Sequence, residues 1–314
     1  MRSLPYCWTR PRSSNLKRGR LDSLKRGRLL VPRRRDLSQT KERDRPTGCG
    51  AEGSPGAALL VQRTSAAKLP IAYKFAKDYI QAMCGRVIQS SGPLRYAIVD
   101  GMNVRDSRVH NFPPRWNAAP SQELLVIRRN HRNGEVSLDP LRWGLIPNWC
   151  NDPTGGRKPI NAKCETVRDL PSFRDAYRTR RCIVPVDAFF EWKAIKGQRA
   201  KQPYAIAMMD GSPFGLAGIW ENWKEPASSE WIRTFAIITT DSNELVADIH
   251  DRMPVILAPG DFARWLGEEP DPRELMRPFP AEPMRMWPIS TRVNKPENDD
   301  PSIVEPVEPA TDAA

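Results

Sequence analysis

The chain has 314 residues and a formal net charge of +12, with 27% charged and 39% hydrophobic residues. It contains no secretory apolar core and no run of about 18 apolar residues, which argues against a secreted or membrane-spanning protein and predicts a cytoplasmic one. Its six cysteines form no Cys-x-x-Cys pair and it has three histidines, so the sequence predicts no metal site and no cofactor.

The excess positive charge lies at the front of the chain. Residues 1–82 hold 19 Lys or Arg and 6 Asp or Glu, a net of +13, whereas residues 83–314 hold 30 and 31, a net of −1. Gly, Ser, Pro and charged residues dominate the front segment, which therefore cannot bury a core. It is interpreted as a nucleic-acid-binding arm, an organelle transit peptide, or sequence translated ahead of a true start at Met83, and we favour the last. Within it, residues 71–82 have the apolar spacing of a helix.

From Cys84 onward the sequence changes to apolar runs with a period of two, separated by Pro and Gly. This pattern is typical of β-strands. The predicted strands are 123–129, 182–193, 203–209, 215–223 and 231–240. Cys182 lies inside the second of these runs and is expected to be a small buried side chain.

Helices are expected to be few and short. The predicted helices are 171–178, 242–249, 261–267 and 272–277. In the second helix, we expect Asp241 to cap the N-terminus and Glu244 to reach back to it. The pattern predicts an α+β fold: a β-rich single domain over residues 83–307 with a curved, barrel-like sheet. Acidic and Pro-rich sequence from about residue 297 predicts a loose tail, with 308–314 as its acidic, flexible end.

Cys84 follows Met83 and has a special chemistry if the chain starts there. Removal of the initiator methionine would leave an α-amine and a thiol on adjacent carbons, with pKa values near ~8 and ~8.5. Such an aminothiol converts an aldehyde first to a Schiff base and then, by addition of sulfur, to a thiazolidine. Without processing, Cys84 is an ordinary thiol inside a longer chain.

Several further motifs follow Cys84 in order along the chain. They are "MCGRVIQS" (83–90), "RWNAAPSQ" (115–122), "LRWGLIPNW" (141–149), "PINAKCETV" (159–167), "RRCIVPVDAFFEWK" (180–193), "AGIWENW" (217–223), "IITTDSN" (237–243), "IHDRMPVIL" (249–257) and "WPISTRVN" (287–294). In these motifs the chain closely resembles the SOS-response-associated peptidase family, abasic-site processing proteins that crosslink to abasic sites in single-stranded DNA. The resemblance covers nearly all of residues 83 to about 307. Family members begin at the Met of Met-Cys-Gly-Arg, which supports Met83 as the start.

The resemblance assigns four catalytic residues. Cys84 corresponds to the crosslinking nucleophile, and Asn161 to an asparagine that holds the amine and the sugar. Glu191 corresponds to the proton carrier; its place between Phe190 and Trp192 independently predicts a raised pKa, because apolar bulk disfavours the charged carboxylate. His250 corresponds to a residue that helps to open the sugar and to reverse the crosslink, a role that suits a side chain titrating near neutrality.

DNA contacts are expected from a local basic and aromatic surface. The candidates are Arg86, Lys163 and Arg252 for phosphates, Asn117 and Pro120 for the path of the strand, and Trp149 and Trp192 for stacking on bases, with Thr239 and Thr240 as weaker candidates near the site. The family usually has Arg where this chain has Lys163, so bidentate contact with a phosphate is lost there.

The sequence therefore predicts a nucleoid-associated monomer that binds abasic sites in single-stranded DNA, forms a thiazolidine crosslink and has peptidase-type and lyase-like activity in the DNA-damage response. Two other classes compete with this hypothesis. An N-terminal-nucleophile amidohydrolase also begins Met-Cys-Gly, and a non-catalytic single-stranded DNA binder would use its basic arm for contact.

Overall fold

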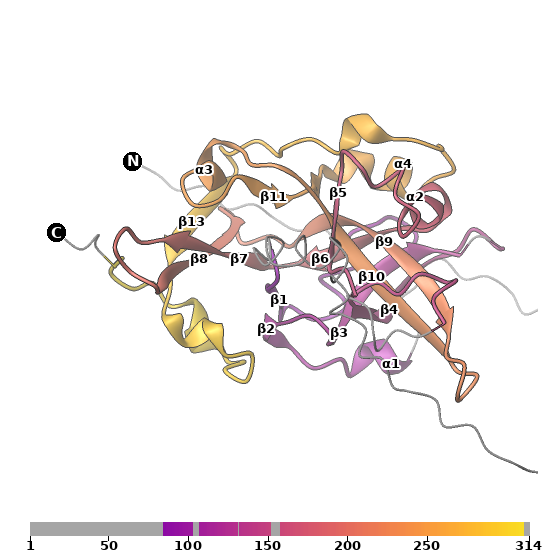
Figure 1. The fold of residues 1–314 in the computed structure, drawn as a ribbon, viewed down its shortest axis with the longest axis horizontal. Coiled ribbons are helices and arrows are strands. Elements are labelled where there is room, and N and C mark those ends of the chain that lie inside the picture. The colour runs from indigo at the N-terminus through magenta and orange to yellow at the C-terminus, as the bar shows by residue number, and fades with distance from the viewer. Residues whose placement is uncertain (1–83, 103–106, 131, 152–157, 311–314) are drawn as a thin grey trace, which may run out of the picture. The chain divides into compact units, whose positions relative to one another are not determined.

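The computed structural model of the chain describes residues 84–102, 107–130, 132–151 and 158–310 (Figure 1). The basic segment 1–82, including its helix-compatible stretch 71–82, lies outside the described residues, as does the end of the predicted tail, 311–314. Among the residues described, no helix is long and apolar enough to cross a membrane.

The structure is rich in strands. The strands are β1 (Val87–Gln89), β2 (Arg115–Ala118), β3 (Glu123–Arg129), β4 (Val136–Trp143), β5 (Asn161–Lys163), β6 (Arg181–Val186), β7 (Ala188–Ala194), β8 (Lys201–Met208), β9 (Phe214–Lys224), β10 (Trp231–Asp241), β11 (Arg252–Pro254), β12 (Ile256–Leu257) and β13 (Met284–Pro288). The helices are α1 (Ser107–His110), α2 (Arg174–Thr179), α3 (Glu244–Ala247) and α4 (Phe262–Leu266), with 3₁₀ turns η2 (Pro259–Asp261), η3 (Arg273–Leu275), η4 (Thr291–Asn294) and η5 (Pro301–Val304).

Five strands close into a barrel. They pair in the order β10-β4-β3-β6-β9, and β9 pairs again with β10, which completes the ring. All neighbours are antiparallel except β10 and β4, which run parallel. The predicted β-rich fold with a barrel-like sheet and few short helices is confirmed.

A second sheet of five strands, in the order β13-β8-β7-β1-β2, lies beside the barrel (Figure 1, left). The predicted strand 182–193 is wrong as one element, because its two halves, β6 and β7, belong to different sheets. Asp187 lies between them and accepts hydrogen bonds from the Ser90 amide at 2.8 Å and the Tyr96 hydroxyl at 2.5 Å. These bonds fix the point where the chain crosses from one sheet to the other.

Side chains of the barrel strands alternate between two buried clusters, as the period of two predicts. Ile183 and Ile238 pack in one cluster with residues of α2 and α4. Trp265 of α4 is fully buried there. Cys182 and Ile237 pack in the other cluster with residues of the second sheet. Cys182 is 0% exposed, which confirms its prediction as a buried small side chain.

The predicted cap of the helix after β10 is wrong. β10 continues through Asp241, so the helix α3 begins later, and its N-cap is Asn243. The Asn243 side chain accepts a hydrogen bond from the Val246 amide at 3.0 Å, which satisfies one of the amides left unpaired at a helix start. Asp241 instead pairs with an arginine of the candidate site described below.

The loose tail predicted from about residue 297 is also wrong for the residues around η5. Asp299 accepts hydrogen bonds from the amides of Trp116 and Asn117, at 2.5 and 2.8 Å. Ile303 of η5 is 0% exposed. The prolines in this stretch suit an ordered segment, because proline fits the first position of a helical turn, as at Pro301.

Candidate functional site

Cys84 and Glu191 meet at the junction of β1 and β7. Cys84 precedes β1, whose Val87 lies opposite Phe189 of β7, and this antiparallel register brings the start of β1 to the far end of β7. The Cys84 main-chain nitrogen donates a hydrogen bond to Glu191 Oε1 at 2.7 Å. The sequence-predicted nucleophile and proton carrier are therefore in direct contact, although 107 residues separate them.

Glu191 is 2% exposed. Burial raises its pKa from 4.5 to about 8, and the hydrogen bond from Cys84 opposes this shift. A carboxyl group with such a pKa exchanges protons readily near neutrality. In a form that begins at Cys84 the Cys84 nitrogen is an amine, and the positive charge of the protonated amine would lower the pKa of Glu191 from this value.

Cys84 is 0% exposed, and burial followed by the charge of Glu191 raises the pKa of its thiol well above 9.0. Its backbone has φ = +30°, a conformation that a residue with a Cβ rarely adopts. An N-terminal residue has no φ, so this strain exists only while a peptide bond precedes Cys84.

Asn161 begins β5, which pairs in parallel with β10 so that Asn161 lies opposite Ile237. Ile160, the residue before it, packs against the buried cluster that contains Cys84. A Cβ added at Gly85 would lie 3.6 Å from Ile160 Cδ1. The chain at Gly85 therefore runs directly beside the start of β5.

His250 lies between α3 and β11. Ile249, which precedes it, packs against the same cluster as Ile160. The His250 side chain is 8% exposed, and burial lowers the pKa of its ring below 6.5. The Arg252 amide donates a hydrogen bond to His250 Nδ1 at 3.0 Å. In the neutral ring Nδ1 is then the acceptor, so the proton lies on Nε2.

Two charged residues that the sequence did not predict, Lys201 and Asp251, act on both Glu191 and His250. The positive charge of Lys201 lowers the pKa of both Glu191 and His250, secondary to burial, and the negative charge of Asp251 raises both. Asp251 Oδ1 lies 3.0 Å from His250 Nδ1, a pairing that forms when the ring is protonated. Asp251 lies inside the quoted "IHDRMPVIL" motif, whereas no sequence pattern distinguishes Lys201.

Arg252 is held by its neighbours. Its guanidinium group donates to both oxygens of Glu165, at 2.5 and 3.0 Å, to Asp241 Oδ1 at 2.9 Å and to the Thr239 carbonyl at 2.8 Å. Its predicted contact with a DNA phosphate therefore competes with two carboxylates. Glu165 was missed by sequence reasoning, although it lies in the "PINAKCETV" motif.

Arg86 and Asn117 hold the segment after β13. Asn117 is 0% exposed, and its side-chain amide donates to the carbonyls of Val293, Lys295 and Asn298. Arg86 donates to Asn117 Oδ1 at 2.9 Å and also to the Val293 carbonyl. Their predicted role as DNA contacts therefore has a structural alternative, because both side chains already bind protein groups.

The remaining predicted contact residues differ in exposure. Trp149 is 58% exposed, whereas Trp192 is half-buried and donates from its indole nitrogen to Asn294 Oδ1 at 2.8 Å. Lys163 is exposed on β5 and Pro120 is half-buried. Trp149 thus has the surface needed for stacking on a base.

The weaker candidates, Thr239 and Thr240, are buried at 0% and 4% exposure near the end of β10. Thr239 lies opposite Lys163 of β5 in the parallel register.

Among the described residues, no group of three or more His, Cys, Asp or Glu side chains could hold a metal ion.

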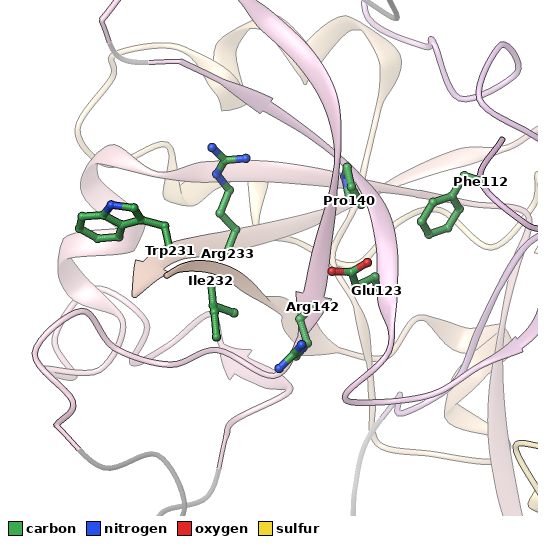
Figure 2. Close-up of a pocket in the computed structure, with 7 residues that line it drawn as sticks. All are labelled: Phe112, Glu123, Pro140, Arg142, Trp231, Ile232 and Arg233. Carbon is green, nitrogen blue, oxygen red and sulfur yellow. The ribbon is translucent and has the colours of Figure 1, made fainter. Parts of the chain in front are cut away.

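A separate pocket of about 410 Å³ lies where the starts of β3 and β10 meet the end of β4 (Figure 2). It is lined by Phe112, Glu123, Pro140, Arg142, Trp231, Ile232 and Arg233. None of the predicted site residues lines it, and Arg142 and Arg233 point in opposite directions (Figure 2). The candidate site is therefore the Cys84 region rather than this pocket.

The profile of the SOS response associated peptidase (SRAP) family matches residues 83–296, and the match begins at the methionine before Cys84. The chain belongs to the SRAP family. The matched range includes all four residues of the predicted SRAP site, Cys84, Asn161, Glu191 and His250.

Relatives with the name abasic site processing protein occur in bacteria and vertebrates. The abasic site processing protein YoqW of Bacillus subtilis (strain 168) is 41% identical over 198 residues, which cover 62% of this chain and 87% of that protein. The abasic site processing protein HMCES of Gallus gallus is 32% identical over 266 residues, covering 72% and 78%. A crystal structure of a Bacteroides thetaiotaomicron protein matches with a TM-score of 0.63 and 29% identity, covering 72% of this chain and all of that one.

Proposed function

We propose that this SRAP protein processes abasic sites by forming a covalent thiazolidine crosslink between an N-terminal Cys84 and the sugar of an abasic site in single-stranded DNA. The adduct shields the damaged strand from cleavage and places the protein in the DNA-damage response. The proposed working form begins at Cys84 and acts as a nucleoid-associated monomer.

The reaction proceeds in two bond-forming steps. The α-amine attacks the aldehyde carbon of the ring-opened deoxyribose, and loss of one water gives a Schiff base. The Cys84 sulfur then adds to the same carbon, and its proton is transferred so that the ring nitrogen ends as a neutral amine. Aldehyde and aminothiol thus give thiazolidine and water, with no change of oxidation state.

Glu191 moves the protons in this scheme. It accepts a proton from the amine before attack, donates one to the leaving hydroxyl group, and accepts the thiol proton as sulfur adds. Asn161 positions the sugar, and His250 assists the opening of the sugar ring and, in reverse, the release of the crosslink. Lys163 and Trp149 contact the flanking strand through a phosphate and a base.

The single observation that carries this proposal is the 2.7 Å hydrogen bond from the Cys84 nitrogen to Glu191 Oε1. When that nitrogen is an amine, the same contact becomes a route for its proton. A buried carboxyl group hydrogen-bonded to the amine can accept its proton and return it, as the three proton movements of the scheme require.

The peptidase activity implied by the family name has a place in this scheme. Hydrolysis of the peptide bond between Met83 and Cys84 would create the amine that the crosslink needs, and release of the strain at Cys84 favours that cleavage. Intact mass of the purified protein measures the first residue directly. A species that begins at Cys84 is expected in every preparation that crosslinks.

The decisive experiment incubates the protein with a single-stranded oligonucleotide containing one abasic site and analyses the product by denaturing electrophoresis. Wild type is expected to give an adduct that persists in detergent and 1 M salt, whereas a non-covalent DNA binder would give none. An oligonucleotide whose abasic sugar lacks the aldehyde serves as the matched control. An adduct with this control would contradict the mechanism.

Cys84→Ser tests the nucleophile. The variant retains the N-terminal amine but loses the sulfur, so it is expected to give no stable adduct and to become trapped only when a Schiff base is reduced with borohydride. A stable adduct without reduction would overturn the role of sulfur. Release of ammonia from glutamine by wild type, with no adduct, would instead favour the N-terminal-nucleophile amidohydrolase.

A further inference from the structure

Glu165 and Arg252 form a bidentate ion pair beside the candidate site. Both carboxylate oxygens of Glu165 accept from the guanidinium group, and the Arg252 side chain is only 12% exposed. Hydrogen bonds from Arg252 lower the pKa of Glu165 to about 2, which keeps the carboxylate charged at any working pH. The pair is thus a fixed feature rather than a switch.

The hydrogen bonds of Arg252 leave little capacity for another ligand. Its two terminal nitrogens carry four hydrogens, and they meet four acceptors: the two Glu165 oxygens, Asp241 Oδ1 and the Thr239 carbonyl. The remaining nitrogen, Nε, is buried and has no partner among the described residues. A DNA phosphate could bind the two terminal nitrogens only by displacing Glu165, Asp241 or the Thr239 carbonyl.

The ion pair connects three parts of the site. Glu165 follows β5, the strand that carries Asn161, by two residues. The Thr239 carbonyl ties Arg252 to β10, against which β5 pairs. The main-chain nitrogen of Arg252 donates to His250 Nδ1 at 3.0 Å. One arginine thus joins the strand of Asn161 to the loop of His250.

We propose that Glu165 is a positioning residue: through Arg252 it fixes the strand that holds Asn161 relative to His250, so that both side chains meet the sugar of the abasic site together. This inference rests on the proposed crosslinking function. Arg252 then acts through protein geometry, and the phosphate contacts of the strand come from other residues.

The test is the variant Glu165→Gln, measured by single-turnover crosslinking over a range of DNA concentrations. Gln preserves size but cannot form the bidentate pair of charges. The saturating crosslinking rate is expected to fall at least tenfold, while the DNA concentration for half the maximal rate stays within twofold. If Arg252 instead binds phosphate and Glu165 competes with it, half-saturation would move to lower DNA concentration and the inference would be overturned.

A matched control and a double variant complete the design. Glu268→Gln breaks another Glu–Arg pair, with Arg129, whose carboxylate is 88% exposed and outside the site; it is expected to leave both parameters unchanged. Arg252→Lys is expected to slow the saturating rate as Glu165→Gln does, and the double variant to be no slower than either single one. Additive losses would show that the two residues act independently and would refute the inference.

Two further observations keep the outcome interpretable. Glu165→Asp retains the charge and is expected to recover part of the rate if Gln impairs folding, as judged by thermal unfolding. No recovery would count against a positioning role. Wild type measured in parallel separates the two proposals, because absence of any wild-type adduct contradicts the crosslinking function, whereas equal rates for wild type and Glu165→Gln contradict only the role of Glu165.

Discussion

Replacing Glu191 by Gln separates two consequences of burying its carboxyl group. Gln has nearly the same shape and can still accept the hydrogen bond from the Cys84 nitrogen through its side-chain oxygen. It cannot ionise, and it cannot carry a proton. We therefore expect the variant to be more stable than wild type at neutral pH and much slower in crosslinking.

The stability effect follows from the raised pKa. In the fold the pKa of Glu191 is about 8, against an ordinary value of 4.5. A group with a raised pKa favours folding fully only below its unfolded pKa, and this contribution is lost as the pH rises toward its folded pKa. At pH 7 the unfolded carboxyl is ionised and the folded one is mostly neutral, so wild type loses about 3 kcal/mol of stability relative to pH 4. Gln avoids this loss.

The measurement is unfolding by urea at pH 4 and pH 7, for wild type and the variant. It uses the full 314-residue chain, in which the Cys84 nitrogen is an amide as in the structure. The variant is expected to gain up to about 3 kcal/mol over wild type at pH 7 and close to nothing at pH 4. An equal difference at both pH values would refute the conclusion that burial keeps this carboxyl neutral.

The rate of the crosslinking form tests the role of Glu191 as proton carrier. Loss of a general acid–base group typically costs about 10²- to 10⁴-fold, and Glu191→Gln is expected to slow adduct formation by at least 100-fold at saturating DNA. Glu221→Gln alters another buried glutamate of raised pKa, which pairs with Arg180, and controls for the effect of a buried neutral substitution. A Glu191→Gln rate within threefold of wild type would eliminate the proposed proton carrier.

Two further predictions concern the rest of the site. Protonation of the Cys84 amine, whose ordinary pKa is about 8, is expected to slow wild type and His250→Gln alike as the pH falls. Because burial lowers the pKa of His250 below 6.5, wild type is expected to lose additional rate below pH 6.5, where the ring gains a proton and Nδ1 can no longer accept from Arg252. The ratio of the wild-type rate to the His250→Gln rate should therefore fall toward low pH, and a constant ratio would contradict this role of His250. Trp149→Ala is expected to weaken binding to single-stranded DNA by about 1 to 3 kcal/mol and to leave the saturating crosslinking rate unchanged. Trp231→Ala alters a tryptophan of similar exposure and should leave DNA binding unchanged. Equal losses of binding for both variants would contradict a specific stacking role of Trp149.

The sequence predicts the fold class because the barrel strands depend on local patterns. The limits of β3 match the prediction, since its period-two alternation divides its side chains between two buried clusters. The division of residues 182–193 into two sheets was not predictable, because it depends on hydrogen bonds to Asp187 from residues nearly a hundred positions earlier. The cap at Asn243 was missed because the extent of β10 is decided by its pairing with β11.

The site shows the same contrast between local and long-range information. The sequence predicts a raised pKa for Glu191 because its neighbours along the strand are aromatic, and the structure confirms this. The partners of Arg252 and Asn117 could not be predicted from the sequence. A motif shows which side chains are present, but it does not show whether an arginine or asparagine binds DNA or another part of the protein. Residues 165 and 241, which hold Arg252, meet only after folding.

The geometry at Cys84 links cleavage of the preceding peptide bond to the crosslinking reaction. While a peptide bond precedes it, Cys84 is held at φ = +30° and its nitrogen is an amide that can only donate to Glu191. Cleavage before Cys84 removes this strain and converts the donor to an amine, which lies against a buried carboxyl group able to exchange protons with it. The same contact that holds the unprocessed chain thus becomes the proton path of the processed one. An uncleaved chain that still forms the stable adduct would break this link, because an amide nitrogen cannot form a Schiff base.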